Sequence, residues 1–270
     1  MILVIDALNK HKFPEIMREM FELRARVFGD RMGWDVTIKD GMERDKFDDM
    51  DPSYAVGLND EGQVVSCVRA LQTTGPHMLA DVFSAILNGE PPLRSATLWE
   101  STRFCVDTKR LARGKGRSSV SYATCELMIA SLEAAKEAGV TDIVTVIDPL
   151  MDRILKRSGN TPYGYVGKQA DMGKVPALAA LLDCTEERIA RIRAFADIHH
   201  DVFIAEDEIV AAENYQPAAQ PVDASERVID LKGYCAEQID AATTDHERGA
   251  ALALQQVLFD KFHSTRACNA

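Results

Sequence analysis

The spacing of apolar residues changes several times along the chain, and each change predicts a different element. A short apolar run opens the sequence as a strand, and residues 15–28 then place apolar side chains at helical spacing. Residues 54–58 and 63–72 alternate between apolar and polar positions around a turn that ends at Gly62, which predicts a hairpin. The charged stretch 29–50 has little periodicity and predicts a long ordered loop, a kind of segment that often carries function.

Helices and strands alternate after the hairpin. The pattern predicts a short helix over 81–88, a strand over 97–106, a helix over 119–138, a buried strand over 140–147 and a helix over 149–157. This order is that of an α/β fold. It is compatible with the N-acetyltransferase (GNAT) fold, a three-layer sandwich around a mixed, mainly antiparallel sheet.

The character of the chain changes near residue 185. Helical patterns over residues 185–203 and 243–262 are separated by an acidic stretch rich in Pro and Ala. We therefore predict two parts, a catalytic domain over residues 1–185 and a helical C-terminal extension over residues 186–270. No catalytic motif or repeat indicates a role for the extension.

Composition narrows the classes of partner and the compartment. A net charge of -11 and a pI near 5.1 disfavour nucleic acid and anionic membranes, because both carry the same sign as the protein. The 6 cysteines have no CxxC pair and no zinc-type spacing, so we predict reduced thiols, no bound metal and a cytoplasmic protein. No apolar run approaches the roughly 20 residues that cross a bilayer, and the N-terminus becomes charged too early for a signal peptide.

Three arginines fall on otherwise apolar elements, where an unpaired charge is costly. Arg24 lies on the apolar stripe of the first helix, Arg69 lies in the second strand of the hairpin, and Arg103 lies in the strand over 97–106. Each of them therefore predicts a carboxylate partner from elsewhere in the fold. The carboxylates that could serve are Asp45, Asp48 and Glu100.

Glu100 and Arg103 share one apolar strand. Strict alternation places them on opposite faces of the sheet, whereas a β-bulge would bring them to the same face. A buried structural ion pair and an active-site pair are both open at this point. On their own, Asp45 and Asp48 favour a solvated acidic loop, because the same run holds further acidic residues such as Glu43.

These residues also form a family pattern. In chain order the sequence reads Arg24-x-x-x-Phe28, Gly33-Trp34, Asp45-x-x-Asp48, Cys67-Val68-Arg69, Met78-Leu79 with Phe83, and Trp99-Glu100-x-x-Arg103-Phe104. This order and spacing resemble those of the acyl-homoserine-lactone synthases, enzymes that make diffusible quorum-sensing signals from an acyl thioester and S-adenosylmethionine. The resemblance covers about the first 185 residues and implies a GNAT-like fold.

The resemblance implies roles for single residues. Arg24, Phe28 and Trp34 would shape the S-adenosylmethionine pocket, where Trp34 offers a π-face to a cationic ligand. Glu100 and Arg103 are the implied catalytic residues. Thr145 resembles a position where many family members that take 3-oxoacyl chains have Thr. The remaining substrate-binding residues that we expect are Asp45, Asp48, Arg69, Phe83 and Phe104.

The implied reaction has two steps, and S-adenosylmethionine is a substrate in both, so no cofactor is expected. Its α-amine attacks the acyl thioester; because an α-amine is largely protonated near neutral pH, Glu100 is the candidate general base, directly or through water. Strand N–H groups near Arg103 would hold the oxyanion. The methionine carboxylate then displaces the sulfonium, which closes the lactone and releases methylthioadenosine.

Two segments bear on the acyl donor. The run Leu111-Ala112-Arg113-Gly114-Lys115-Gly116 has Leu where a coenzyme-A-dependent acetyltransferase has a polar residue in its pyrophosphate loop, which favours an acyl carrier protein. Arg153, Lys156 and Arg157 form a basic face on the helix over 149–157. Such a face is either simply solvated or a docking site for an acidic carrier protein.

Two other functions compete with a lactone synthase. One is a GNAT-type acyltransferase that uses coenzyme A and a different amine; the altered pyrophosphate loop and the set Asp45, Asp48 and Arg69 disfavour it. The other is a catalytically inactive relative that acts as a binding protein. The presence of Glu100 with all three arginines disfavours that alternative.

Overall fold

The computed structural model describes residues 1–111, 120–171 and 176–211, together with residues 248 and 252. The chain divides into two compact units, Met1–Ala218 and Ala219–Ala270. Apart from residues 248 and 252, the helix predicted over 243–262 lies outside the described residues, and so does most of the pyrophosphate-type loop. The boundary predicted at residue 185 stays a prediction.

The described elements of the first unit are nine strands and their connecting helices. The strands are β1 (Ile2–Ile5), β2 (Ile38–Lys39), β3 (Met42–Glu43), β4 (Ser53–Leu58), β5 (Val64–Gln72), β6 (Leu98–Val106), β7 (Asp142–Ile147), β8 (Gly164–Asp171) and β9 (Pro176–Asp183). The α-helices are α1 (Pro14–Arg24), α2 (Met78–Asp81), α3 (Val120–Glu137), α4 (Pro149–Arg157), α5 (Glu186–Ala196) and α6 (Glu206–Ala211). A π-helix (Ala25–Arg31) and short 3-10 helices (Lys10–Lys12, Lys46–Asp49 and Ser84–Leu87) complete them.

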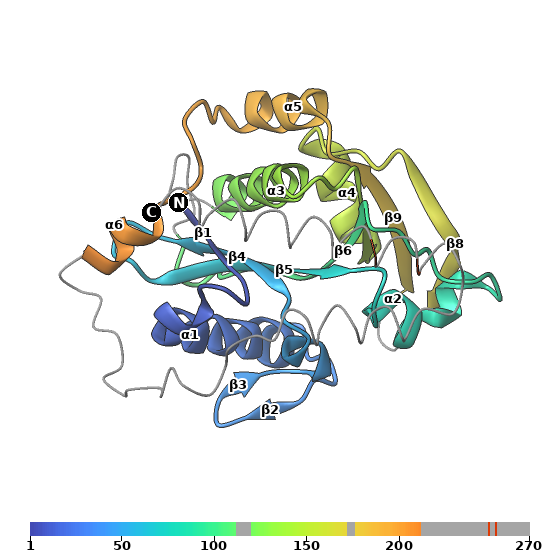
Figure 1. Cartoon of the computed structure of the whole chain (residues 1–270), viewed down its shortest axis with the longest axis horizontal. Helices are drawn as coiled ribbons and strands as arrows, with labels where there is room; N and C mark the ends of the chain where they lie inside the picture. Colours follow the sequence, from blue (N-terminus) through green and yellow to red (C-terminus); the bar gives the residue numbers. More distant parts are fainter. Residues whose placement is uncertain (112–119, 172–175, 212–247, 249–251, 253–270) are drawn as a thin grey trace. The chain divides into compact units, whose positions relative to one another are not determined.

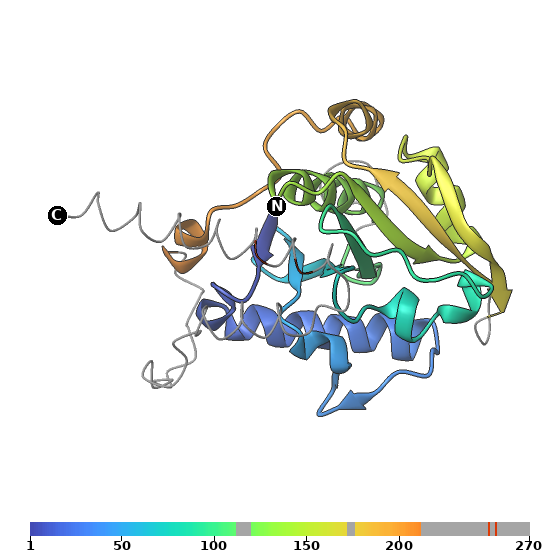
Figure 2. The ribbon, with the colours of Figure 1, turned by 45° about the vertical axis from the view of Figure 1, so that its right-hand side comes forward.

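Seven of the strands form one sheet in the order β1-β4-β5-β6-β7-β9-β8 (Figure 1). Strands β6 and β7 pair in parallel, and the other neighbours pair antiparallel. Helix α1 covers one face of the sheet and α3 covers the other, with α5 packed outside α3 (Figure 1; Figure 2). The predicted α/β sandwich around a mixed, mainly antiparallel sheet is therefore confirmed.

Each face of the sheet buries its own apolar core. On one face, Met20, Phe21 and Phe28 from α1 and the π-helix pack with Val56 and Cys67 of the sheet. The core on the opposite face is built on α3 together with β7 and α5. Its residues include Leu127, Leu132, Ile143, Ile147, Ile189 and Ile192. The apolar side chains at helical spacing in residues 15–28 thus pack against the sheet.

Two hairpins were not predicted. The stretch 29–50, expected to be a loop, holds the end of the π-helix, the β2–β3 hairpin and a 3-10 helix. Its turn is Asp40-Gly41, where both residues have positive φ (52° and 78°), the backbone that type I′ hairpin turns require. Strands β8 and β9 form the second hairpin, and its last strand is rich in alanine, a residue depleted in strands.

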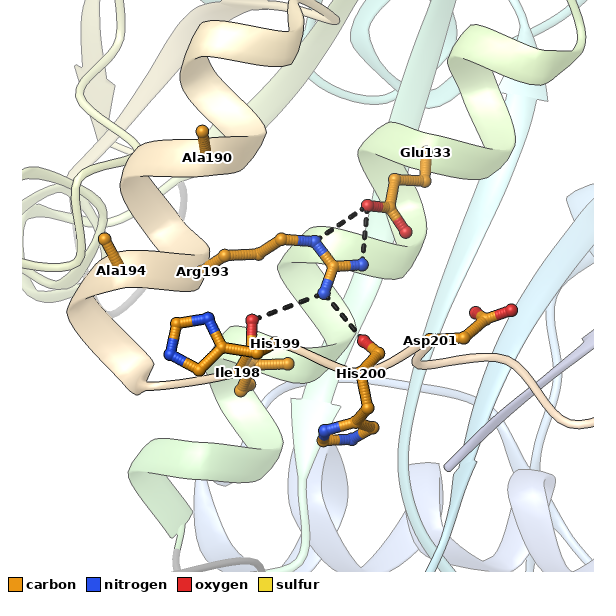
Figure 3. A pocket seen from close by; sticks show the side chains of 8 residues that line it. All are labelled: Glu133, Ala190, Arg193, Ala194, Ile198, His199, His200 and Asp201. Atoms are coloured by element: carbon orange, nitrogen blue, oxygen red, sulfur yellow. Dashed lines mark hydrogen bonds and ion pairs between the residues drawn. The ribbon is translucent and has the colours of Figure 1, made fainter.

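The segment after α5 ties the helix to the rest of the first unit. From α5, Arg193 donates through Nε and Nη2 to one carboxylate oxygen of Glu133 on α3, at 3.0 and 2.7 Å, and through Nη1 to the carbonyls of Ile198 and His200 (Figure 3). The same residues line a surface hollow of about 580 Å³. In these bonds Arg193 donates only to α3 and to the segment that follows α5. We therefore interpret the hollow as a structural contact between these elements.

Candidate active site

Six charged side chains meet on the α1 face of β5 and β6. We call this group the charged cluster; its members are Arg24, Arg69, Arg103, Glu43, Asp45 and Asp48. Three cations and three anions balance one another, so the cluster is neutral as a whole. The sequence-based prediction that the three arginines need carboxylate partners is confirmed by these contacts.

Arg24 lies at the centre of the buried part of the cluster. Its Nη1 and Nη2 donate to the two oxygens of Asp48 at 2.7 and 2.9 Å, and its Nε donates to Oε2 of Glu43 at 2.6 Å. All three side chains have an exposed fraction of 0%. Such a two-pronged, charge-assisted arrangement fixes both partners. The alternative of a solvated acidic loop is therefore wrong for Asp48.

Arg69 joins the same carboxylates from β5. Its Nη1 donates to Oδ1 of Asp45 at 2.6 Å and to Oδ1 of Asp48 at 2.8 Å, and its Nη2 donates to Oδ2 of Asp45 at 3.0 Å. Its Nε donates to the hydroxyl of Thr102 on β6 at 3.1 Å. Asp45 also accepts the N–H of Phe47 and begins the 3-10 helix, so local capping brings its carboxylate to this position.

Arg103 reaches the cluster through a bulge in β6. Cys105 lies opposite Cys67 and Thr102 lies opposite Arg69, so β6 has one more residue than β5 between these pairs. Arg103 itself has a φ of 56°, an uncommon conformation for a residue with a side chain. Its guanidinium pairs with Glu43 at 3.0 Å and with Asp45 at 2.7 Å. The sequence left regular alternation and a bulge open, and the structure has the bulge.

Burial and pairing shift the pKa values in the cluster. Burial alone would raise the pKa of Asp48, but its bonds to Arg24 and the charge of Arg69 lower it well below the usual range. Burial would lower the pKa of Arg24, and Asp48 and Glu43 raise it instead. Tyr54 donates its hydroxyl to Asp48 at 2.7 Å, and burial together with that carboxylate raises the pKa of the phenol. Asp48 and Arg24 are therefore both charged throughout the neutral range.

Glu100 is fully buried and binds backbone rather than an arginine. Its Oε2 accepts the N–H of Met78 at 2.7 Å, and its Oε1 accepts the N–H of Leu79 at 2.5 Å. The expectation that Glu100 pairs with one of the arginines is not met by these bonds; Glu43 takes that place. Burial raises the pKa of Glu100 to about 7, although both N–H donors and the charge of Arg69 act in the opposite direction.

Two aromatic rings extend from the exposed edge of the cluster. Phe28 and Trp34 stack with their centroids 5.1 Å apart and their planes 19° apart. The guanidinium carbon of Arg103 lies 5.6 Å from the centroid of Phe28. Trp34 has an exposed fraction of 37%, so part of the indole is open to a ligand.

The structure brings together some of the predicted substrate-binding residues and separates others. Phe83 packs beside Met78. Phe104 packs against the core built on α3. Thr145 lies on the same face of β7 as Ile143 and Ile147, which belong to that same core. The last two residues therefore lie across the sheet from the charged cluster, and their predicted roles stay predictions.

The parallel pairing of β6 and β7 ends beside Thr145. The last registered pair is Ser101 with Thr145, although β6 continues to Val106 and β7 continues to Ile147. The two strands therefore separate beyond this pair. Phe104 and Thr145 flank the separation on the α3 face, whereas Glu100 and Arg103 lie on the α1 face.

The predicted carrier-docking helix is amphipathic. On α4, Leu155 is buried, whereas Arg153, Lys156 and Arg157 are exposed. Lys156 pairs with Asp152 at 2.7 Å and lies 5.6 Å from the centroid of the Tyr165 ring. The apolar side chains of Leu150 and Ile154 are also partly exposed, at 57% and 37%. Basic and apolar groups thus share one exposed surface.

Glu43 is the cluster member that sequence reasoning missed. The sequence alone groups it with the acidic residues of a loop, yet its carboxylate joins Arg24 to Arg103 and is fully buried. The Asp40-Gly41 pair was the available signal, since this dipeptide predicts a hairpin and a hairpin gives Glu43 a strand position.

Other classes of site receive no support in the described part of the chain. Its residues include no group of three His, Cys, Asp or Glu side chains arranged to hold a metal ion. Four cysteines in these ranges, Cys67, Cys105, Cys125 and Cys184, are free thiols. A search of the same ranges finds no helix that is both long and apolar enough to cross a membrane.

The fold is GNAT-like, and its bulged strand β6 carries the buried Glu100 beside the charged cluster. This combination is that of an acyl-transferring enzyme. The family model described as "Autoinducer synthase" matches residues 8–192, and the chain belongs to that family. The chain is therefore an acyltransferase of the acyl-homoserine-lactone synthase type.

Individual relatives agree with this assignment. An acyl-homoserine-lactone synthase of Agrobacterium fabrum is 38% identical over 181 residues, which are 67% of this chain and 85% of that protein. A probable acyl-homoserine-lactone synthase of Sinorhizobium fredii is 36% identical over 192 residues, which are 71% of this chain and 91% of that protein.

Solved structures are similar as well. The AHL synthase LasI superposes with a TM-score of 0.62 at 29% identity and covers 72% of this chain and 94% of that chain. A CoA-dependent acyl-homoserine lactone synthase, BjaI, solved with SAM and isopentyl-CoA, has a TM-score of 0.65 at 23% identity and covers 73% and 90%. At that identity, BjaI supports the fold alone.

Proposed function

We propose that this protein makes an N-acyl-L-homoserine lactone from S-adenosylmethionine and an acyl-acyl carrier protein. The observation that carries the proposal is that the partly exposed ring of Trp34 and the guanidinium of Arg103 both lie against Phe28, at the accessible edge of the charged cluster. A ligand that is both aromatic and charged fits this edge.

Burial divides the cluster into two parts with different tasks. Arg24, Arg69 and Asp48 have an exposed fraction of 0%, and they act as a rigid scaffold. Arg103 and Asp45 are exposed by 10% and 19%. In the proposed complex Trp34 stacks with the adenine or the sulfonium, Asp45 faces positive charge, and Arg103 faces the methionine carboxylate.

Glu100 supplies the base for amide formation in this proposal. A carboxyl whose pKa is near 7 is half ionised at neutral pH and accepts a proton from an ammonium more readily than an ordinary carboxylate does. Each carboxylate oxygen keeps a second lone pair after it accepts one backbone N–H, so the bonds from Met78 and Leu79 hold the group without blocking it. Lactone closure is intramolecular and depends on how the bound carboxylate is oriented.

The exposed face of α4 is the proposed dock for the carrier protein. Arg153, Lys156 and Arg157 give it positive charge on a protein whose net charge is -11, and the exposed side chains of Leu150 and Ile154 add apolar area. An acidic partner would be steered to such a surface. The separation of β6 from β7 offers a path for the acyl chain, with Phe104 and Thr145 beside it.

Binding of S-adenosylmethionine is testable through Trp34. A Trp99→Phe variant leaves Trp34 as the single tryptophan, and we expect its fluorescence to change in a saturable way as S-adenosylmethionine is added. The Trp34→Phe variant, which keeps Trp99, serves as the control and should give no such change. A flat titration in the Trp34-only protein would remove Trp34 from the binding site.

The choice of donor is testable by charge reversal. We expect an Arg153→Glu, Arg157→Glu double variant to raise KM for the acyl carrier protein thioester at least about tenfold and to leave KM for the matching coenzyme A thioester unchanged. Lys136→Glu, on α3, is the control for a general loss of positive charge. If wild type prefers the coenzyme A thioester and the double variant behaves like it, the carrier-protein part of the proposal is wrong.

A further inference from the structure

Met78 lies between the charged cluster and Glu100. It is the first residue of α2 and is almost fully buried. Its side chain packs with Phe47, Leu71 and Phe83. The sequence pattern included Met78 only as part of the family resemblance, without a role.

The sulfur of Met78 accepts hydrogen bonds from two guanidinium groups. Nη2 of Arg69 lies 3.2 Å from Sδ, and Nη1 of Arg103 lies 3.4 Å from it. A guanidinium has five N–H donors. The other four donors of Arg69 go to oxygens of Asp45, Asp48 and Thr102, so the bond to sulfur accounts for the fifth.

The main chain of the same residue holds Glu100. The N–H of Met78 donates to Oε2 of Glu100 at 2.7 Å. This bond persists with any side chain at position 78 except proline, whereas the contacts with Arg69 and Arg103 depend on the sulfur. Substitution at this position therefore separates the hold on the general base from the hold on the arginines.

A thioether suits a place where an arginine must be held and later released to a ligand. It is a weak, uncharged acceptor, so it satisfies a buried N–H without competing strongly against an incoming oxygen. A carboxylate here would give Arg103 a third charge-assisted partner beside Glu43 and Asp45 and reduce its attraction for substrate. Removal of the acceptor would leave a donor of the buried Arg69 and a donor of the partly buried Arg103 unpaired.

We propose that Met78 is a positioning residue, whose sulfur orients Arg69 and Arg103 so that Arg103 can bind the carboxylate of S-adenosylmethionine. This inference rests on the proposed function of the site. Nη1 of Arg103 moves from the thioether to a carboxylate oxygen when the substrate binds, and no covalent bond at Met78 changes.

Two substitutions at position 78 test the proposal, with steady-state kinetics for S-adenosylmethionine as the measurement. Met78→Leu keeps the size and removes the acceptor, and we expect KM to rise about tenfold with a smaller change in kcat. Met78→Gln restores an acceptor oxygen, and we expect it to recover most of the lost affinity. The pH midpoint of kcat should stay near its wild-type value in both variants, because the N–H bonds to Glu100 remain.

Met128→Leu is the matched control, since Met128 is also buried and accepts a hydrogen bond from Ser158, but it belongs to the core on the α3 face. It should show wild-type KM. Equal KM in wild type, Met78→Leu and Met78→Gln would overturn the proposal, and so would equal impairment of the two variants with matching losses of Tm, which would indicate packing alone. A wild-type protein that makes no lactone would instead overturn the proposed function, and the positioning role of Met78 with it.

Discussion

Side chains of the charged cluster differ in how far they reach solvent, and their burial predicts different outcomes on substitution. Asp48 has five hydrogen-bond donors around it and is buried, whereas Arg103 lies at the accessible edge. We expect Asp48→Ala to lower the free energy of unfolding by about 3–5 kcal/mol, because it leaves Arg24 and Arg69 as uncompensated buried charges.

Arg103→Gln provides the contrast to that substitution. Its loss of stability should be clearly smaller, because the side chain is partly exposed, while lactone formation should fall at least about a hundredfold if Arg103 binds the reacting carboxylate. Chemical denaturation and product formation measured on the same samples would separate the two effects. Equal stability losses in the two variants would contradict the division into a scaffold and a ligand-binding edge.

Glu100 predicts a specific dependence of stability on pH. Its folded-state pKa of about 7 is raised above its usual value of 4.5, so its contribution to stability is fully present below about pH 4.5 and is lost as the pH rises through about 7. In the Glu100→Gln variant, the side-chain NH₂ group faces a backbone N–H donor. The variant is therefore less stable than wild type at every pH. The stability deficit of this variant relative to wild type should therefore shrink between pH 5 and pH 8.

The same group predicts the opposite dependence for activity, because the base must be ionised. We expect kcat to rise with pH around a midpoint near 7, and Glu100→Gln to lose about 10²–10⁴-fold in kcat together with that limb of the profile. A Glu100→Gln enzyme that keeps the wild-type profile would exclude Glu100 as the base.

Sequence reasoning succeeded for residues whose chemistry conflicts with their surroundings. Arg24 and Arg69 sit at apolar positions of periodic elements, so their burial and their need for partners could be predicted. Glu43 gave no such conflict, because one acid in an acidic run is ordinary and only the hairpin turn places it inside. Whether Glu100 would bind an arginine or a helix N-terminus depended on tertiary contacts with Met78 and Leu79 that no local pattern encodes.

At the scale of elements, β8 depends on a glycine that lets it approach the 3-10 helix Ser84–Leu87. A Cβ on Gly167 would lie 1.9 Å from the carbonyl oxygen of Ile86, and φ there is 63°. We expect Gly167→Ala to cost about 3 kcal/mol or more, because backbone atoms must move. Gly62→Ala is the control: φ is 76° but nothing lies within 4 Å, so only the backbone penalty of about 1–2 kcal/mol applies. Similar melting temperatures for the two variants would contradict this packing.

Elements with strong periodicity were the ones that could be predicted. Helix α4 was predicted with its observed bounds, because Pro149 begins it and Gly159 follows its end. Strand β9 was not predicted, because Ala177, Ala179 and Ala180 fit a helix as well as a strand, and pairing with β7 and β8 decides between them.

At the scale of the whole molecule, α5 belongs to the core of the first unit. Ile189, Ile192, Ile198 and Val202 are buried, and burial of each contributes about 1.5–3 kcal/mol. The carbonyl of Val202 also accepts the N–H of Ile2 at 2.7 Å, so this segment pairs with the edge strand β1. We expect a chain that ends at residue 185 to be insoluble or unfolded, and one that ends at residue 218 to melt cooperatively.

Circular dichroism of the two truncated chains measures this difference directly. It also tests the domain boundary predicted from the sequence, since a folded and active 1–185 fragment would show that the catalytic domain ends there. In that case the contacts of α5 with α3 would be dispensable for the fold.

The central claim is that the site joins an acyl group to S-adenosylmethionine and then closes a lactone. The most direct measurement is to incubate the purified full chain with S-adenosylmethionine and acyl carrier protein thioesters and to follow both products by mass spectrometry. We predict methylthioadenosine and an acyl-homoserine lactone in equal amounts. Formation of an acylated amine without methylthioadenosine, or of neither product, would contradict the account.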